Sequence, residues 1–360
     1  MENIPDAARY DDGTRPEGAG ARGRRKRGAS MADVAQLAGV SAQTVSRVSN
    51  GFPGVVAATR QQVLAAMKEL GYRPNSAARA LKRGEFRTLG VILFNMSTTG
   101  NMRTLEAVAL SAAQEGYATT LMPVSMPSQG EVSGAFNRLG ELAVDGVVLL
   151  MEVHLLDAAM VSLPPNAQVV VVDSNAGDRY CVVDTDQAGG ARTAVRHLLD
   201  LGHETVWHVA GPEGAFSAER RVAAWRSVLA EAGRDVPELL RGDWSTESGY
   251  LAGQRIAADL SCTAVFVAND QMALGVLRAL HESGRRIPED VSVVGFDDIP
   301  EASSFIPPLT TVHQDFSEVG RRCVEGVLRQ IRNDTAEKGT TLVPTRLVIR
   351  GSTAAPAGDR

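Results

Sequence analysis

The sequence predicts two unlike parts, a small all-helical N-terminal domain and a large α/β body. Residues 30–72 carry apolar side chains at helical spacing, and glycines interrupt the pattern. After Arg87, short apolar runs alternate with helical stretches, which is typical of βαβ units and mostly parallel sheets. This second part is long enough for two subdomains with a cleft between them.

Composition limits the kind of protein. Hydrophobic residues make up 44% and charged residues 22% of the 360, which suits a globular chain with a large core. We expect no membrane span and a cytoplasmic location, because no long apolar run and no signal-peptide-like N-terminus occur. Cys181, Cys262 and Cys323 are widely spaced, so neither a disulfide framework nor a metal site is predicted. No motif predicts a cofactor.

Charge is unevenly distributed along the chain. Between Arg22 and Arg87, 13 Lys and Arg residues face three acidic residues, whereas the whole chain has a net charge of −5. A basic segment on an acidic body is typical of a nucleic-acid binder joined to a different partner domain. By charge alone, a solvated basic surface is an equally good interpretation.

The helical segment divides into three predicted helices after a disordered tail over residues 1–29. Ser30–Asp33 resembles a capping box, and Gly39 ends the first helix. Ser41 is placed to cap the second helix. The third helix is predicted from Thr59 to Leu70.

The second helix has the features of a DNA-reading element. Val45 and Val48 fall on its inner side, so the helix is expected to present polar side chains outward. Gln43 suits bidentate contact with adenine, and Arg47 suits guanine. The other candidate DNA contacts on this helix are Ser41, Ala42, Thr44, Ser46 and Asn50, of which Thr44, Ser46 and Asn50 suit phosphate. The alternative is a small helical bundle whose exposed side chains are merely polar.

The apolar runs of the body predict seven strands: Leu89–Phe94, Thr119–Val124, Gly146–Met151, Val169–Asp173, Val206–Ala210, Ala264–Ala268 and Val291–Phe296. Several of these runs end in polar groups, at Asp173, at Asn269 with Asp270, and at Asp297 with Asp298. Ligands bind beyond the carboxyl ends of such strands. One aspartate alone is as well explained as a turn residue or helix cap, but the repetition favours a polar ligand cleft.

The helical segment and its continuation resemble the LacI/GalR family of bacterial regulators. The resemblance rests on Val34-Ala35, Ala38-Gly39-Val40-Ser41, Thr44–Val48, Asn50, Thr59-Arg60, Leu70-Gly71-Tyr72, Pro74-Asn75, Ala78-Arg79 and Leu81. It covers about residues 31–350. It implies a helix-turn-helix headpiece over residues 30–74, a hinge helix and linker over 75–87, and a periplasmic-binding-protein-like body of two Rossmann-like subdomains over 88–350.

The resemblance also implies how the hinge meets DNA. Asn75, Ala78 and Leu81 would contact the duplex, with Leu81 wedged into the minor groove, as apolar wedges do at kinked steps. An ordinary buried leucine is the alternative. The sequence departs from the family at Ala42, where a family member carries a large aromatic reader. It departs again before the third helix, where Val55-Val56-Ala57 lacks the Ser or Asp cap that is common in the family.

Seven body residues match the family's effector positions. The resemblance implies that Arg221 grips ligand hydroxyls, Trp244 forms an aromatic wall, and Asn269 reaches the ligand. The others are Asp297 as a hydroxyl acceptor, Gln314 and Phe316 at the pocket floor, and Asp173 by a looser match. Arg221 as a surface charge, Trp244 as core packing and Asp270 as a helix cap remain alternatives. The set suits a neutral sugar, and a galactoside-like glycoside is the leading expectation.

These features together predict a repressor of a carbohydrate-utilisation operon that a sugar releases from pseudo-palindromic operator DNA. Co-repression by the sugar stays open. Residues 351–360 are expected to form a flexible tail without an apolar heptad, which favours a homodimer. An enzyme is not expected, because no G-x-S-x-G, P-loop or H-E-x-x-H motif occurs. A transport-type sugar-binding protein is disfavoured by the headpiece.

Overall fold

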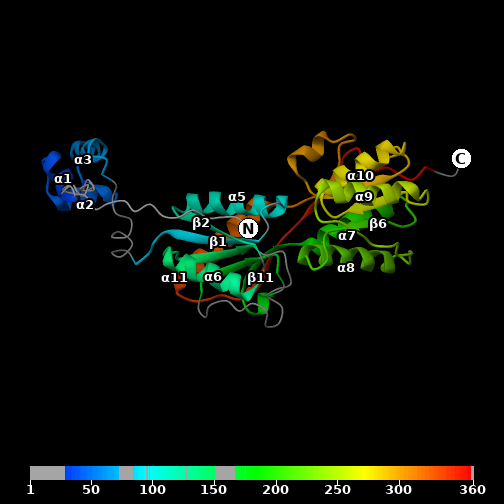
Figure 1. Ribbon diagram of the computed structural model, residues 1–360, viewed down its shortest axis with the longest axis horizontal. Helices are drawn as coiled ribbons and strands as arrows, with labels where there is room; N and C mark the ends of the chain where they lie inside the picture. Colours follow the sequence, from blue (N-terminus) through cyan, green and yellow to red (C-terminus); the bar gives the residue numbers. More distant parts are fainter. Residues whose placement is uncertain are drawn as a thin grey trace, which may run out of the picture. The chain divides into compact units, whose positions relative to one another are not determined.

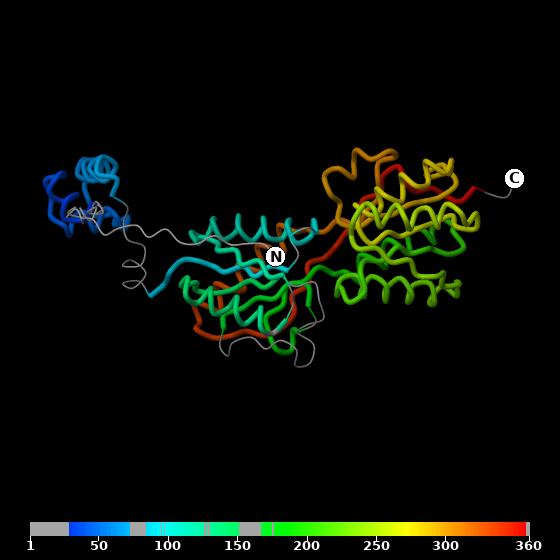
Figure 2. Tube along the Cα trace, viewed as in Figure 1, coloured from blue at the N-terminus to red at the C-terminus, as the bar shows by residue number. Residues whose placement is uncertain are grey.

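The computed structural model describes residues 29–72, 84–94, 96, 98–125, 128–150, 167–174 and 176–357. The chain forms two compact units, residues 1–82 and 83–360. Each unit is described separately, and Figures 1 and 2 trace the elements of both. In the described part of the chain, no helix is long and apolar enough to span a bilayer.

The first unit contains the predicted three-helix headpiece. Its helices are α1 (Met31–Leu37), α2 (Ala42–Ser49) and α3 (Ala57–Glu69). Ser30 and Asp33 form the predicted capping box, because the side chain of each accepts from the backbone N–H of the other. Gly39, at φ 62°, makes the turn between α1 and α2, where a left-handed conformation favours glycine. The missing cap at Val56 is also confirmed.

A small apolar core fixes the three helices. Val34, Val45 and Val63, one from each helix, have no exposed surface. Ala35 is buried between them, so the small side chain lets α1 and α2 approach closely. Because Val45 and Val48 are buried, the opposite side of α2 is exposed.

The second unit contains two six-stranded sheets, as the alternation of apolar runs predicts. The first sheet has the order β11-β5-β4-β3-β1-β2, and all its pairs are parallel. Its strands are β1 (Thr88–Phe94), β2 (Ala118–Val124), β3 (Gly146–Leu150), β4 (Val169–Val172), β5 (Cys181–Thr185) and β11 (Gly339–Val343). Its helices are α5 (Thr99–Gln114), α6 (Gln129–Glu141) and α11 (Phe316–Asn333), and a 3₁₀ turn covers Ala176–Asp178.

The second sheet has the order β12-β10-β9-β8-β6-β7, in which only β12 is antiparallel to its neighbour. Its strands are β6 (Trp207–Ala210), β7 (Leu240–Arg241), β8 (Ala264–Val267), β9 (Ser292–Asp297), β10 (Thr310–His313) and β12 (Arg346–Val348). Its helices are α7 (Gln187–Asp200), α8 (Phe216–Glu231), α9 (Thr246–Ala258) and α10 (Asp270–Glu282), with a 3₁₀ turn at Pro300–Ser304.

Helices cover both faces of each sheet. In the first subdomain α5 and α11 pack on one face and α6 on the other. In the second subdomain α7 and α8 pack on one face and α9 and α10 on the other. The sheets are therefore buried on both sides, which explains why most of their strands read as continuous apolar runs.

The chain crosses between the subdomains three times: after β5, after β10, and between β11 and β12. Asp186 and Asp315 lie at the first two crossings, and each caps the helix that follows. Their side chains accept from the backbone N–H groups of Gly189 and Glu318, at 2.8 and 2.9 Å. The crossings bring the carboxyl ends of strands from both sheets toward the same region.

The prediction of a flexible tail over residues 351–360 is wrong for residues 351–354. Ser352 is fully buried, and its hydroxyl donates to the carbonyl of Val293 at 2.6 Å and accepts from Thr310 N–H at 2.8 Å. The next residues contact His197 and His203. This segment therefore belongs to the second subdomain, because its polar groups are satisfied there rather than by water. Residues 358–360 lie outside the described part.

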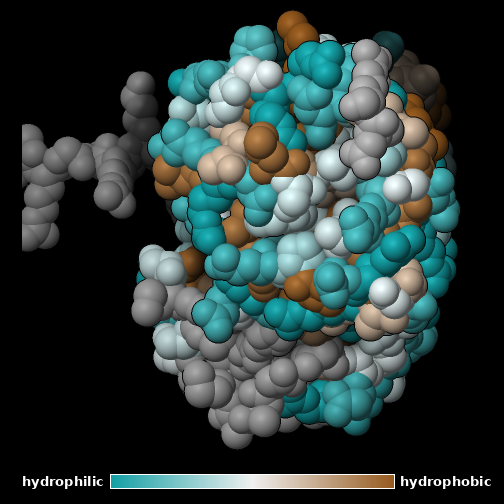
Figure 3. Space-filling model, turned by 90° about the vertical axis from the view of Figure 1, so that its right-hand side faces the viewer, coloured by the Kyte–Doolittle hydropathy of each residue, from teal (hydrophilic) through white to brown (hydrophobic). Residues whose placement is uncertain are grey.

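The end of the body that carries the second subdomain has a mixed surface. Figure 3 shows polar residues over most of this face, with apolar residues single or in small groups. Scattered apolar residues of this kind are normal for a protein surface, so the described residues visible on this face form no broad apolar patch.

Candidate functional site

The exposed face of α2 carries the side chains predicted to read DNA. Ala42, Gln43 and Arg47 are exposed, while Thr44 and Ser46 are half-buried. Ser41 caps the helix, because its hydroxyl accepts from Thr44 N–H at 3.1 Å. The helix therefore begins at a fixed point and presents a polar face.

Two of the predicted phosphate-binding side chains also bond within the helix. The amide of Asn50 donates to the carbonyl of Ser46 at 2.8 Å and to its hydroxyl at 3.3 Å. The hydroxyl of Thr44 is paired with that of Ser41 at 3.0 Å. These contacts fix the side chains at the two ends of α2. Asn75, Ala78 and Leu81 of the predicted hinge lie outside the described residues.

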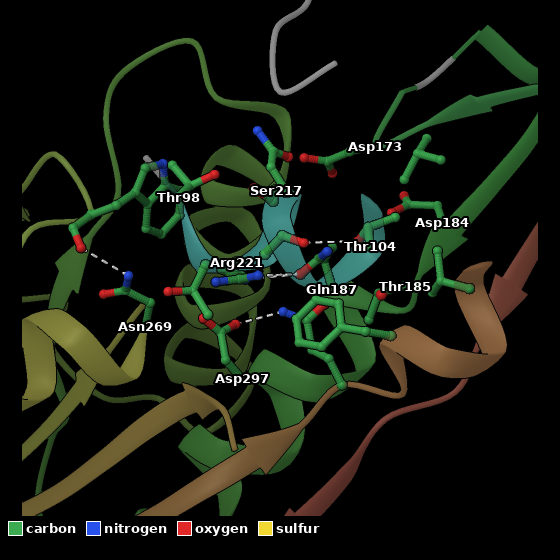
Figure 4. A pocket seen from close by; sticks show the side chains of 18 residues that line it. Thr98, Thr104, Asp173, Asp184, Thr185, Gln187, Ser217, Arg221, Asn269 and Asp297 are labelled. Carbon is green, nitrogen blue, oxygen red and sulfur yellow. Dashed lines mark hydrogen bonds between the residues drawn. The ribbon is translucent and has the colours of Figure 1, made fainter. Parts of the chain in front are cut away.

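A cleft lies between the two subdomains of the body, where the carboxyl ends of the strands meet. The empty space within it, open solvent included, is about 600 Å³. All seven side chains predicted to bind an effector line it: Asp173, Arg221, Trp244, Asn269, Asp297, Gln314 and Phe316. Figure 4 shows Arg221 between Asn269 and Asp297 on one side and Asp173 and Asp184 on the other.

Arg221 is held in place by groups from three elements. It projects from α8 and is 3% exposed. Its Nε and Nη2 donate to Oε1 of Gln187 at 2.9 and 2.7 Å, and Nη1 donates to the carbonyl of Ala268. The guanidinium lies 3.8 Å from the centroid of the Phe296 ring. Arg221 is therefore not a surface charge but a buried cation fixed before any ligand arrives.

Asp297 ends β9 beside this cation. It is 7% exposed, and Oδ1 accepts from Nε2 of Gln314 at 2.6 Å. Burial raises the pKa of Asp297 to about 6, although the charge of Arg221 and the bond from Gln314 oppose the shift. The carboxyl is therefore placed to accept a hydrogen bond from a ligand hydroxyl.

Two further carboxyl groups, those of Asp173 and Asp184, line the opposite side of the cleft. Asp184, in β5, is 1% exposed and forms an ion pair with Arg220 at 3.3 Å. Burial raises the pKa of Asp184 well above its ordinary value, and the nearby negative charge of Asp173 raises it further. This side of the cleft therefore disfavours additional negative charge.

Trp244 forms part of the wall and is only partly buried. Its indole packs on Gly211, where an added Cβ would lie 2.2 Å from the ring. Its Nε1 is buried without a hydrogen-bond partner among the described residues. The close approach to Gly211 fixes the ring, so Trp244 offers a rigid aromatic surface rather than ordinary core packing.

Strained backbone marks the same residues. Asp173, Trp244 and Asp297 all have positive φ, at 58°, 73° and 117°. Residues other than glycine adopt such angles at a cost of about 1–3 kcal/mol each, and they concentrate at functional sites. Three of the seven cleft candidates are therefore held in conformations that local preference disfavours.

Asn269 both lines the cleft and caps α10, a role that the sequence offered as an alternative for Asp270. Asn269 caps α10, because Oδ1 accepts from Met272 N–H at 2.9 Å, and its amide donates to the carbonyl of Trp244 at 3.0 Å. Asp270 does not cap the helix. It is fully buried and accepts from Ile299 N–H at 2.9 Å and from the hydroxyl of Thr311 at 2.6 Å. Its role is to tie α10 to the loop after β9.

Sequence reasoning missed most of the side chains from the first subdomain. The start of α5 supplies a group of small polar residues to the cleft: Thr98, Thr99, Asn101 and Thr104. Thr99 meets Gln271 of the other subdomain, whose amide donates to its hydroxyl at 2.5 Å. Gln187 and Asp184 were also missed. The available signal was an acid at the end of an apolar run, Cys181–Asp184, of the kind already noted elsewhere.

The lining of the cleft is rich in polar side chains. In the described part, no group of three or more His, Cys, Asp or Glu side chains is arranged to hold a metal ion. The lining offers three carboxyl groups, one arginine, several hydroxyls and one indole. Such a set matches a neutral ligand with many hydroxyls.

Comparison with known proteins agrees with the division of the chain into a headpiece and a two-subdomain body. The profile for a periplasmic binding protein-like domain matches residues 195–353, and that for bacterial regulatory proteins of the lacI family matches residues 30–75. The lactose operon repressor of Escherichia coli (strain K12) is 36% identical over 91% of each chain. The ribose operon repressor of the same strain is 32% identical over 90% of this chain and 99% of its own.

A solved structure shows the same architecture. The lac repressor dimer bound to operator and the anti-inducer ONPF matches with a TM-score of 0.80 and 34% identity, covering 91% of this chain and all of that one. The headpiece and the two-subdomain body thus define a DNA-binding transcriptional regulator with an effector domain. The chain belongs to the lacI family of bacterial regulatory proteins. The homologues are regulators, not enzymes.

Proposed function

We propose that this regulator represses a carbohydrate-utilisation operon and leaves its operator when a neutral sugar fills the cleft. The supporting observation is the convergence of Asp173, Arg221, Trp244 and Asp297 on one cavity. The lining carries one arginine against three carboxyl groups, so an anionic nucleotide or sugar phosphate would be repelled. The names of the lactose and ribose operon repressors support a sugar.

A galactoside is the first sugar to test. In this proposal Arg221 and Asp297 hold ring hydroxyls, and Asn269 and Gln314 complete the polar contacts. Trp244 stacks on the apolar face of the ring, with Phe316 below it. Asp173 contributes an acceptor from the other subdomain, so a bound sugar would contact both sheets. A ligand that bridges the subdomains is able to bias their arrangement.

The test is titration of the full-length protein with neutral mono- and disaccharides, including galactosides, and with matched sugar phosphates. Tryptophan emission reports binding, and retardation of a selected DNA duplex reports release. We expect a neutral sugar to change both signals, and Trp244→Ala to lose the emission response while still binding DNA. Tighter binding of a sugar phosphate than of any neutral sugar would contradict the proposal. If the sugar instead tightens DNA binding, it acts as a co-repressor and not as an inducer.

The DNA-bound form is proposed to be a homodimer on a pseudo-palindromic operator in the cytoplasm. One headpiece would read each half-site through Gln43 and Arg47, with Asn75, Ala78 and Leu81 at the hinge. The solved lac repressor relative is a dimer. Light scattering should report two chains, and a monomer that holds its site tightly would contradict this.

A further inference from the structure

The turn that ends α2 places an aromatic ring beside Arg47. Gly51 has a φ of 70°, its N–H donates to Val48 at 3.1 Å, and the next N–H, of Phe52, donates to the carbonyl of Arg47 at 2.9 Å. This pair of bonds is the Schellman motif, in which the residue after the glycine contacts the residue that accepts its bond. The contact usually joins two apolar side chains. Here it joins Phe52 to Arg47.

Further contacts fix the position of Phe52. Nη2 of Arg60, in α3, donates to its carbonyl at 2.5 Å. The ring lies over Gly54, where an added Cβ would be 2.8 Å from Cε1 of Phe52. The backbone N–H, the carbonyl and the ring are therefore each held by a different residue. The ring itself does not belong to the headpiece core and is 50% exposed.

The guanidinium of Arg47 lies over this ring, 5.6 Å from its centroid. That distance is within the range of a cation–π contact. Arg47 is exposed on the face of α2 that is proposed to read bases. A long exposed arginine loses rotamer freedom when it forms a bidentate bond to a base, which weakens binding. A fixed ring beside it reduces that loss, because part of the ordering is done before DNA arrives.

We propose that Phe52 is a positioning residue for base reading, which holds the guanidinium of Arg47 toward the base edge. The inference rests on the proposed reading of DNA by Arg47. It assigns Phe52 no contact with DNA of its own. The specificity of the regulator then depends on a residue outside the second helix, in the turn that follows it.

The experiment compares five full-length proteins on DNA: wild type, Phe52→Leu, Phe52→Tyr, Arg47→Ala and the double variant Arg47→Ala/Phe52→Leu. Each selects sites from a pool of duplexes with a randomised core, and affinity is measured for the wild-type site and its single-base variants. Phe52→Leu keeps an apolar residue in the Schellman position and removes the ring. Phe52→Tyr keeps the ring and is the matched control. Circular dichroism verifies that each variant is folded.

We expect Phe52→Leu to weaken binding to the selected site by about two- to fivefold, the size of an exposed cation–π contact. The loss should fall on the one symmetric base position that Arg47→Ala also relaxes, and Phe52→Tyr should retain the wild-type preference. In the Arg47→Ala background, Phe52→Leu should have no further effect. A uniform loss on all sequences, or an equal loss without Arg47, would overturn the inference and leave packing or direct DNA contact as the role of Phe52.

The same data separate this inference from the proposal that it rests on. If the wild-type protein selects no preferred sequence, the proposed DNA reading fails. If it selects a site whose preference Arg47→Ala leaves unchanged, Arg47 reads no base and the inference fails with it. If Arg47→Ala relaxes one position and Phe52→Leu does not, only the inference fails.

Discussion

Arg47 in the headpiece and Arg221 in the body carry the same charge in opposite surroundings. Arg221 is 3% exposed, and its donors are bonded to Gln187 and Ala268. Arg47 is exposed, and the structure places a single ring beside its guanidinium. The first is bonded within the folded structure, whereas the second has only the Phe52 ring beside it. The proposed effector cavity is thus built into the core, and the proposed DNA-reading surface lies outside the headpiece core.

This difference predicts that Arg221, unlike Arg47, contributes strongly to stability. Arg221→Met should lower the free energy of unfolding by about 2–4 kcal/mol, because Gln187 and Ala268 lose their donor in a buried site. It should also abolish the response to sugar. Urea unfolding of the full chain measures the first effect. Arg226→Ala, an exposed arginine on the same helix, is the control and should stay within about 0.5 kcal/mol of wild type. An Arg221→Met protein as stable as wild type would refute the contrast.

The carboxyl group beside Arg221 should make stability depend on pH. The pKa of Asp297 is about 6 in the folded protein against 3.8 ordinarily. Between these values the folded state keeps a proton that the unfolded state has lost, so stability falls as the pH rises through this window. The free energy of unfolding of the wild type should fall by an amount on the order of 2 kcal/mol between about pH 4 and pH 7 because of this group. Asp297→Asn should not show this fall.

Denaturant midpoints of wild type and Asp297→Asn across that pH range measure the effect. Asp290→Asn is the matched control, because pairing with Arg286 lowers the pKa of Asp290 to about 2. Its contribution to stability is present above pH 3.8 and is lost only as the pH falls toward 2, so it should not change within the window. A wild-type stability that rises between pH 4 and pH 7 relative to Asp297→Asn would contradict the assignment.

For Arg47 the effect should appear on DNA and not on folding. Arg47→Ala should cost about 1–3 kcal/mol of discrimination at one symmetric base position. The free energy of unfolding should change by less than about 0.5 kcal/mol, since the side chain is exposed. Affinities for the selected site and for its single-base variants measure the loss. Wild-type discrimination in this variant would show that α2 does not use Arg47 to read bases.

The sequence predicted the elements whose local pattern is strong. The capping box at Ser30 and the inward side of α2 follow from adjacent residues, and the structure contains both. All seven predicted strands coincide with observed ones. Of the missed strands, β7 and β12 have two and three residues, and β11 has exposed positions. The existence of these three depends on pairing with a neighbouring strand, which a local pattern does not contain. The missed strands β5 and β10 are short buried runs, and for β5 the apolar pattern at Cys181–Asp184 was a usable signal.

The cleft residues that lie at the ends of strands were predictable from the sequence. Asp173 and Asp297 have that position, and the family resemblance supplied Arg221 and Trp244. Thr99 and Gln187 were not predictable, because small polar residues at helix starts are common and only the meeting of the subdomains makes them cleft residues. The same applies to residues 351–354, whose composition suggested a tail and whose hydrogen bonds make them part of the body.

The prediction with the smallest expected effect concerns the N-terminus of α3, which lacks a side-chain cap. Val56 stands at the N-cap of α3 with φ −54° and ψ 139° and forms no cap bond, whereas Ser41 caps α2 with its hydroxyl. Val56 is 73% exposed, so its replacement removes little packing. Val56→Ser should therefore stabilise α3 by about 0.5–1 kcal/mol. Hydrogen exchange of the first turn of α3 in the full chain should slow by roughly two- to fivefold. Val56→Ala is the control, because it removes the same side chain without adding an oxygen. If the two variants exchange at the same rate, the serine forms no cap, and the absence of a cap at this helix costs the headpiece nothing.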